Sequence, residues 1–248
     1  MNHAGKGGHG GSASIELTDY WWYRVRSQLL QTILRRYVED PARVLDVGSA
    51  DGPSVSWLAA REIKVALDID PRGLEAGSGV CGSAMQLPFP DATFEVVSAF
   101  DVIEHCEPED VVVAELARVL VPGGRLLLSV PAYQWAWSDF DEENGHHRRY
   151  TRTRAVAAVE AEGLEVVRAS YAFAATFPLF AVERATRRFK QAVRRHGRQR
   201  PADVVAVPEV SRVADRLLTW LGGLDDGVLR RHDLPFGSSV VVAARKPG

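Results

Sequence analysis

Short apolar runs alternate with helix-length stretches along most of this chain, and this alternation constrains the fold more than any other feature. Five runs bounded by turn residues have the length and side chains of buried strands: 43–47, 63–69, 94–100, 125–130 and 164–169. Helix-length stretches lie between several of them: 54–61, 108–120 and 151–162. Strands alternating with helices predict an α/β fold, a parallel sheet covered on both faces that binds ligands at the carboxyl ends of its strands.

The beginning of the chain predicts an amphipathic helix over residues 19–38. Its apolar side chains recur at three- and four-residue steps: Trp22, Val25, Leu29, Ile33 and Tyr37. The segment 20–26 is dense in aromatic residues, and we weigh two interpretations of it. It is either a lid over a bound ligand, with Tyr23 or Arg24 in contact, or simply part of the core.

The end of the chain departs from the alternation. The last predicted strand, 238–246, follows a long helical zone in place of a single crossover helix. One apolar stripe in that zone has helical spacing: Val210, Val213, Ala214, Leu217, Leu218 and Leu221. We therefore expect a core of residues 15–173 and 236–248 and a helical insertion at 174–235 that packs against it. Residues 1–14, rich in Gly, His and Ser, are expected to form a disordered tail.

Composition excludes several classes of protein. The formal net charge of −2 argues against a surface built for nucleic acid. Cys81 and Cys106 lack metal-ligand spacing and are too few for a disulfide framework, so neither is expected, and no metal site is predicted. No run approaches the roughly 18 apolar residues of a membrane span. Since residues 1–14 also lack the apolar centre of a signal peptide, we expect a cytoplasmic location.

The segment 44–58 carries the strongest indication of function, because an apolar strand runs into a tight turn of small residues and then a helix. Gly48 and Gly52 let the backbone bend sharply and approach a ligand, and the following helix offers free N–H groups to a negative ligand group. Twenty residues after Gly48, Asp68 ends the next strand, where a carboxylate accepts the hydroxyls of a ribose. The simpler alternative is a turn glycine and an unrelated surface acid. Ala50 stands where a dinucleotide-binding turn needs its middle glycine, which disfavours a pyrophosphate.

From residue 40 to about 170 the chain resembles class I S-adenosylmethionine-dependent methyltransferases, in the group that includes the quinone-biosynthesis enzymes. Six segments match in family order: 44–52, 66–71, 87–90, 94–97, 101–105 and 118–125. The resemblance implies a Rossmann-like, mostly parallel seven-stranded sheet with helices on both faces and an antiparallel last strand, preceded by the helical insertion. It also implies S-adenosyl-L-methionine as the cofactor.

The resemblance further implies roles for individual residues. Asp46, Gly48, Ser49 and Gly52 shape the site for the methionine end, Asp68 binds the ribose and Ile69 lies against the adenine. Contacts to the adenine amino group fall to Ser83, Ala84 and Met85, whereas Phe100 and Asp101 close the pocket behind the sulfonium. The family commonly has Asp in place of Ser83, so the contact of this side chain to the adenine amino group is in doubt. It also usually has Gly in place of Ala50, although alanine still allows the turn.

The acceptor side is expected on two loops, residues 104–105 and 131–150. The second loop is long and aromatic, and it resembles a subgroup whose loop ends in His-Arg-Arg-Tyr. Tyr133 and Trp135 are candidates for the wall of an apolar pocket, and Arg148, Arg149 and Tyr150 for substrate contacts. His147 is the candidate general base, and His105 either lines the cofactor pocket or acts in catalysis. The alternative is that His147 and the arginines pin the loop to the next helix.

A basic run in the insertion suggests a partner as well. Eight basic residues oppose only Glu183: Arg184, Arg187, Arg188, Lys190, Arg194, Arg195, Arg198 and Arg200. They form either a peripheral contact to an anionic membrane or phosphate, or an ordinary solvated face. The leading hypothesis is methyl transfer to a hydroxyl or amine of a small or carrier-linked acceptor. A nicotinamide-dependent oxidoreductase and a non-catalytic adenosylmethionine-binding protein are the alternatives.

Overall fold

The computed structural model describes residues 20–48, 55–71, 74, 79–194 and 210–248, with the side chains of 189–194 left out. Seven strands form one sheet: β1 (Arg43–Val47), β2 (Ile63–Asp68), β3 (Gly79–Cys81), β4 (Phe94–Phe100), β5 (Leu120–Pro131), β6 (Glu165–Ala172) and β7 (Ser239–Arg245). Their order is β3-β2-β1-β4-β5-β7-β6, and β7 runs antiparallel to both of its neighbours while the remaining pairs are parallel. The predicted seven-stranded, mostly parallel sheet is confirmed.

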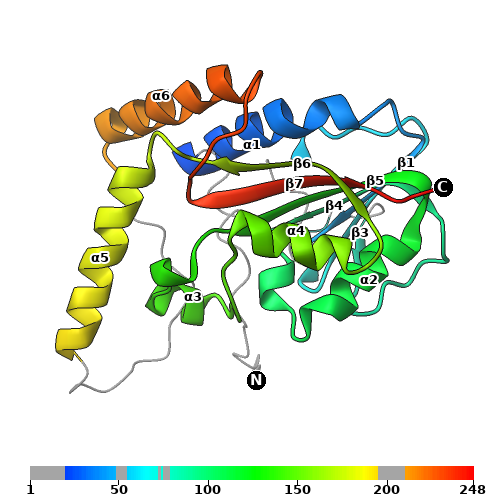
Figure 1. The fold of residues 1–248 in the computed structure, drawn as a ribbon, viewed down its shortest axis with the longest axis horizontal. Coiled ribbons are helices and arrows are strands. Elements are labelled where there is room, and N and C mark those ends of the chain that lie inside the picture. The colour runs from blue at the N-terminus through cyan, green and yellow to red at the C-terminus, as the bar shows by residue number, and fades with distance from the viewer. Residues whose placement is uncertain (1–19, 49–54, 72–73, 75–78, 195–209) are drawn as a thin grey trace, which may run out of the picture.

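Helices cover both faces of the sheet (Figure 1). They are α1 (Trp21–Leu34), α2 (Glu109–Val119), α3 (Asp139–Glu143), α4 (Arg152–Glu160), α5 (Phe177–Arg194) and α6 (Arg212–Leu229). Figure 1 shows α1 and α6 above the sheet, α2 and α4 below it, and α5 and α3 beyond the end at which β5 finishes. Three single turns complete the described elements: η2 (Arg35–Tyr37), η5 (Ile103–His105) and η6 (Gln134–Ala136).

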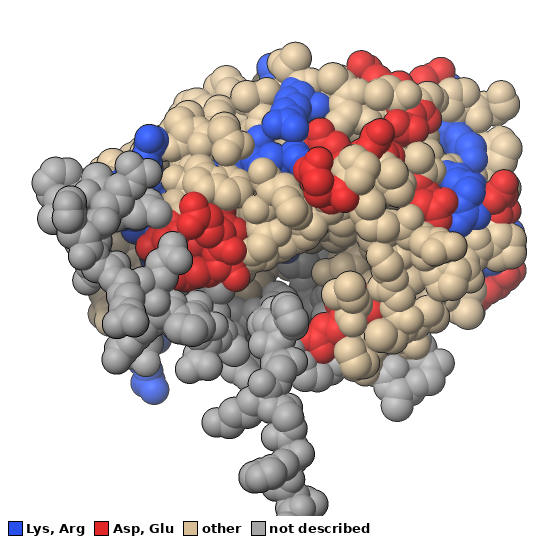
Figure 2. Space-filling view, turned by 90° about the horizontal axis from the view of Figure 1, so that it is seen from below, with Lys and Arg blue, Asp and Glu red and all other residues tan. Residues whose placement is uncertain are grey.

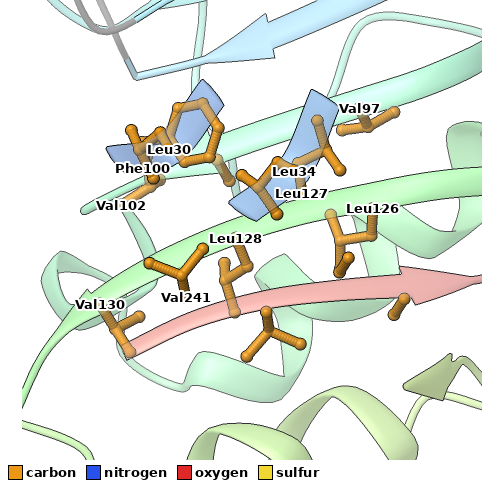
Figure 3. Close-up of a cluster of buried hydrophobic side chains, with 14 of the residues drawn as sticks. Leu30, Leu34, Val97, Phe100, Val102, Leu126, Leu127, Leu128, Val130 and Val241 are labelled. Carbon is orange, nitrogen blue, oxygen red and sulfur yellow. The ribbon is translucent and has the colours of Figure 1, made fainter. Parts of the chain in front are cut away.

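The core lies between these layers, and β5 contributes to both faces of the sheet. Leu126, Leu127 and Leu128 are all at most 1% exposed, as expected for a strand buried on both faces. Figure 3 shows this part of the core, with Leu30 and Leu34 of α1 beside the sheet. Burial of such side chains stabilises a fold by about 1.5–3 kcal/mol each.

Two expectations about secondary structure were wrong or incomplete. Residues 55–61, the described part of the helix predicted at 54–61, form turns and irregular chain. A stretch of eight residues gains few helical hydrogen bonds for the cost of nucleation, so tertiary contacts decide its conformation. Strand β3 was not located from the sequence, because its three residues are too few to display a period.

Within its described residues, the helical zone before β7 contains the two helices α5 and α6, but the predicted packing stripe of α6 was only partly right. Leu218 and Leu221 are partly buried, whereas Val213 and Leu217 are 78% and 52% exposed. The face turned to α1 instead carries Gly222, whose added Cβ would meet Val25 Cγ1 at 2.5 Å. A small residue at this position lets the two helices approach each other closely. None of the helices in the described ranges has the length and apolar character needed to cross a membrane.

Candidate functional site

The candidate cofactor site begins where β1 ends, at Gly48. This glycine has a φ of +74°, and a Cβ added to it would lie 2.5 Å from Val102 Cγ2. Its amide donates a hydrogen bond to the Leu67 carbonyl at 2.7 Å, which joins the turn to β2. Only glycine fits both the left-handed backbone and the close approach to Val102. The predicted contacts Ser49 and Gly52 lie outside the described residues.

Asp46 is buried beneath this turn. Its carboxylate is fully inaccessible and accepts a hydrogen bond from the Ser98 hydroxyl at 2.6 Å. This bond ties β1 to β4 at the level of the turn. The location agrees with a role in shaping the site from below.

Asp68 ends β2 beside Gly48, since the register pairs Val47 with Leu67. The side chain is partly exposed, and its Oδ1 accepts a hydrogen bond from the Asp70 amide at 2.8 Å. Ile69, the predicted adenine contact, follows it with 78% of its surface exposed. A carboxylate and an apolar side chain therefore stand at the edge where the parallel strands end, which is where α/β sheets bind ligands.

The segment predicted to contact the adenine amino group lies next to Asp68. The Gly82 amide donates to the Asp68 carbonyl at 2.9 Å, and a turn at Ser83, Ala84 and Met85 follows. The Ser83 hydroxyl accepts a hydrogen bond from the Met85 amide at 3.2 Å. The structure thus brings these three residues to the same edge as Asp68, with the Ser83 side chain occupied in its own turn.

Phe100 and Asp101 end β4, and Asp101 has a backbone φ of +59°. Such a conformation is costly for a residue other than glycine and persists only where its surroundings impose it. Arg26 of α1 imposes part of it, because its guanidinium lies 2.8 Å from the Asp101 carboxylate and donates to the Ser129 hydroxyl at 2.9 Å. Phe100 is buried behind this pair.

Arg26 was not singled out from the sequence, although a signal was present. It lies on the apolar face of α1, one position after Val25, and is only 9% exposed. Arg24, which we named as a possible lid contact, instead pairs with Asp215 of α6 at 2.7 Å. An arginine on the buried face of a helix requires a carboxylate partner, and this rule distinguishes Arg26 from Arg24.

Three potential metal ligands meet just after β4. Glu104, His105 and His146 each offer a ligand atom, and these atoms all lie within 4.8 Å of one another. The two imidazole rings pack edge to face with centroids 4.6 Å apart. Glu104 is fully buried, and neither of its carboxylate oxygens has a hydrogen-bond partner in the described part of the chain.

The electrostatics of this cluster are unusual. Burial raises the pKa of Glu104 well above its ordinary value, and Asp101 raises it further, while Arg26 and Arg149 oppose the shift. His105 is exposed as a residue, but the protein around its ring partly desolvates it. This desolvation, together with the nearby His146, lowers the pKa of His105 to about 4. His105 is therefore neutral at pH 7.

His147, the predicted general base, does not join this cluster. His147 is exposed, and its backbone amide donates a hydrogen bond to the Glu104 carbonyl at 2.7 Å. The neighbouring His146 takes the inward position and its Nδ1 lies 2.9 Å from Asp141 Oδ1. Sequence reasoning missed His146, because consecutive residues of an irregular loop give no periodicity from which to assign sides.

Arg149 is anchored inside the protein. Its Nε lies 2.7 Å from Asp141 Oδ1, and the group also donates to the Ala132 carbonyl at 3.2 Å. Burial alone would raise the pKa of Asp141, but hydrogen bonding to His146 and pairing with Arg149 outweigh it and lower that pKa. The Ser138 amide also donates to Asp141, at 3.0 Å.

Arg148 and Tyr150 are likewise occupied. Arg148 pairs with Glu107 and donates to the Cys106 carbonyl at 2.6 Å, whereas the Tyr150 hydroxyl donates to Glu109. Tyr150 is fully buried, and both arginines are less than 10% exposed. These contacts favour the alternative interpretation, in which the two arginines pin the loop, and the substrate contacts of Arg148, Arg149 and Tyr150 remain predictions.

The aromatic residues of the same loop lie nearer the surface. Tyr133 and Trp135 stack at 5.9 Å, and Phe177 of α5 contacts both rings edge to face. Trp135 remains 45% exposed, so an apolar wall is present beyond the end of β5. Figure 2 shows acidic side chains gathered over α3 on the face seen from below, with both signs of charge mixed elsewhere on that face.

The described part of the basic run serves the fold. Arg184 is buried and donates to the Ser138 hydroxyl at 2.5 Å, Arg187 pairs with Glu183, and Arg188 donates to the Trp135 carbonyl at 2.7 Å. These contacts favour a solvated and anchored face over a membrane or phosphate contact. The other members of the run lie outside the described side chains: Lys190, Arg194, Arg195, Arg198 and Arg200.

Comparison with known proteins now identifies the family. Residues 45–128 match the family described as "Methyltransferase domain". The chain contains a class I S-adenosylmethionine-dependent methyltransferase domain. The match includes Asp46, Gly48, Asp68 and Asp101 and ends before the loop at 131–150.

Individual relatives support this assignment. The biotin biosynthesis bifunctional protein BioHC of Cellvibrio japonicus is 33% identical over 141 residues, covering 51% of this chain and 28% of that protein. A malonyl-[acyl-carrier protein] O-methyltransferase of Herminiimonas arsenicoxydans is 33% identical over 138 residues, covering 50% and 53%. The chain thus spans about half or less of the length of these relatives.

A solved structure shows the same fold. The N-methyltransferase NodS from Bradyrhizobium japonicum, in complex with S-adenosyl-L-homocysteine, superposes with a TM-score of 0.54 at 15% identity, covering 94% of this chain and 91% of that one. The methyltransferase fold therefore extends over nearly the whole chain, beyond the part matched by sequence.

Proposed function

We propose that the protein transfers a methyl group from S-adenosylmethionine to a hydroxyl or amine of a small or carrier-linked acceptor. The observation that carries this proposal is the pair Gly48 and Asp68, side by side at the carboxyl ends of β1 and β2. Gly48 lets the chain turn sharply where β1 ends, and the partly exposed Asp68 presents the acceptor oxygens that a ribose needs.

The donor side needs little chemistry from the protein. Bound S-adenosylmethionine supplies a methyl group on a sulfonium, which is already activated for transfer. The task of the chain is to hold the acceptor in line with that methyl group, and such positioning accounts for several kcal/mol of the barrier. Asp101, held by Arg26 and Ser129, provides a rigid floor where β4 ends.

The acceptor is proposed to lie between this floor and the aromatic wall of Tyr133 and Trp135. A hydroxyl acceptor also has to lose its proton, and an amine has to arrive unprotonated. His105 and His147 are the proposed proton acceptors, and both lie on this side of the sheet. The relative from Herminiimonas arsenicoxydans is named for an acyl-carrier-protein acceptor, which supports including carrier-linked substrates in the search.

Calorimetry with S-adenosylmethionine, S-adenosylhomocysteine and NAD tests the donor. We expect the first two to bind and NAD not to bind, and Asp68→Ala to weaken adenosylmethionine binding at least about tenfold, or about 1.4 kcal/mol. Glu62→Ala is the matched control, because Glu62 is an exposed acid at the opposite end of β2. Unchanged affinity in Asp68→Ala, or binding of NAD alone, contradicts the proposal.

Transfer of a labelled methyl group to a panel of hydroxyl, amine and carrier-linked acceptors tests turnover. Binding of the donor without transfer to any acceptor supports a non-catalytic binding protein instead. The variants His105→Ala and His147→Ala then distinguish the two proposed proton acceptors. Removal of the required histidine lowers turnover while the affinity for adenosylmethionine stays the same.

A further inference from the structure

The buried carboxylate of Glu104 has no role in the site described above, and it lies beside two histidines. A buried carboxylate normally receives several hydrogen bonds, because an unpaired one loses its hydration without compensation. No other carboxylate in the described ranges is buried with both oxygens unpartnered. The two oxygens of Glu104 are therefore available to bind a ligand.

We propose that Glu104, His105 and His146 bind a divalent metal ion, which leaves an open coordination position for an oxygen atom of the acceptor. The three ligand atoms lie within 4.8 Å of one another. Bonds of about 2.0–2.2 Å place neighbouring ligands about 3–3.5 Å apart, so the side chains close by no more than about 1–2 Å.

The surroundings of the histidines support this assignment. Asp141 accepts a hydrogen bond from Nδ1 of His146, which leaves Nε2 with the lone pair that a metal needs. A carboxylate behind a metal-binding histidine is the usual arrangement, because it fixes both the ring orientation and the tautomer. Arg149 and Ser138 in turn hold Asp141 in place.

The charge balance also favours a cation. Two arginines lie near Glu104, but each has its own carboxylate: Arg26 pairs with Asp101, and Arg149 pairs with Asp141. Glu104 is therefore left without an arginine of its own. Two nitrogens and one oxygen suit zinc, cobalt, iron or manganese better than calcium or magnesium.

The position of the cluster suggests its purpose, and this part of the inference rests on the proposed methyl transfer. Val102, which contacts the turn at Gly48, is only two residues before Glu104. His105 is exposed, so the metal faces the side from which an acceptor arrives. A bound metal lowers the pKa of a hydroxyl. Because His105 as a metal ligand cannot accept the proton, the hydroxyl releases it to water or to the exposed His147. The oxygen forms a bond to the methyl carbon as the carbon–sulfur bond breaks, and the electron pair of that bond stays on sulfur.

Titration with Co²⁺ and Zn²⁺ tests the site directly. The full chain is first treated with a chelator, and it carries His3→Ala and His9→Ala so that the histidines near the start of the chain do not bind metal. We expect one ion per chain, with visible absorption from bound Co²⁺, and a rise in the thermal midpoint on addition of Zn²⁺.

Variants of two of the three ligands locate the ion. Glu104→Gln and His146→Ala should each lower metal affinity at least about tenfold. Glu104→Gln is expected to fold, because it removes a buried unpaired charge, and its thermal midpoint should no longer respond to Zn²⁺. His147→Ala is the matched control: it deletes the adjacent, exposed histidine and should leave the affinity for metal unchanged.

Absence of a bound ion, or binding that Glu104→Gln and His146→Ala leave intact, overturns the inference. The outcome is separable from that of the proposed function. If the protein binds adenosylmethionine but no metal, the proposed function stands and the metal site is ruled out. If both proposals hold, Asp68→Ala should bind adenosylmethionine weakly and still bind Co²⁺.

Discussion

The proposed donor side and the proposed acceptor side of this molecule are built in different ways. On the proposed donor side, at the ends of β1 and β2, the described residues include a glycine turn and one partly exposed carboxylate. On the proposed acceptor side, the loop at 131–150 is held by buried ion pairs of Asp141 with Arg149 and Arg184. The family match covers the first region and stops before the second. The turn at Gly48 depends on a particular backbone shape, whereas the loop at 131–150 depends on side-chain partners that only the folded loop brings together.

The largest expected effect comes from removing the centre of the acceptor loop. Asp141→Ala leaves Arg149 buried without its carboxylate, and breaking a buried pair in this way costs about 3–5 kcal/mol of unfolding free energy. Urea denaturation measures the loss. The pKa of Asp141 is lowered on folding, so its contribution is complete above pH of about 4 and disappears as the pH falls further.

Asp139→Ala is the matched control for this experiment. Asp139 belongs to the same short helix but its side chain is 46% exposed, so a change within about 0.5 kcal/mol is expected. If the two sides are independent, the folded Asp141→Ala variant binds adenosylmethionine with nearly wild-type affinity. A large loss of that affinity would show that the acceptor loop also supports the donor site.

A smaller effect is expected where α1 connects the two sides. Arg26→Ala removes a buried, charged hydrogen-bonding group from Asp101 and Ser129, at a cost of about 1.5–3 kcal/mol. Arg24→Ala removes a more exposed pair with Asp215 and should cost about 0.2–1 kcal/mol. Thermal unfolding of the two variants compares them, and equal losses would contradict the assignment of Arg26 as the structural contact.

A smaller effect than that of Arg26→Ala is expected on the proposed donor side. Gly48→Ala places a Cβ against Val102 in a left-handed backbone, which costs about 1–2 kcal/mol and weakens adenosylmethionine binding. Gly223→Ala is the control, because nothing lies within 4 Å of its added Cβ and alanine favours the helix α6. Denaturation should therefore show a loss of stability for Gly48→Ala and a gain for Gly223→Ala, and calorimetry measures the affinity for adenosylmethionine. Unchanged stability of Gly48→Ala would mean that the turn adapts to the added Cβ.

The same contrast explains what could be predicted from the sequence. All strands except β3, and the positions of Gly48 and Asp68 at strand ends, were predicted because strand period, turn chemistry and spacing are local properties of the chain. The partners of Arg148 and Arg149 were not, because Glu107, Glu109 and Asp141 are brought together only by the folded loop. Likewise, His146 and His147 are adjacent in sequence, and only tertiary structure decides which of them turns inward.

Arg26 has a practical consequence for anyone who exchanges parts between related enzymes. The match to the methyltransferase-domain family begins at residue 45, so a hybrid cut at that boundary would inherit a different first helix. Asp101 would then meet an unrelated surface at the point where it now finds a guanidinium. A graft of this catalytic module should therefore start no later than residue 20.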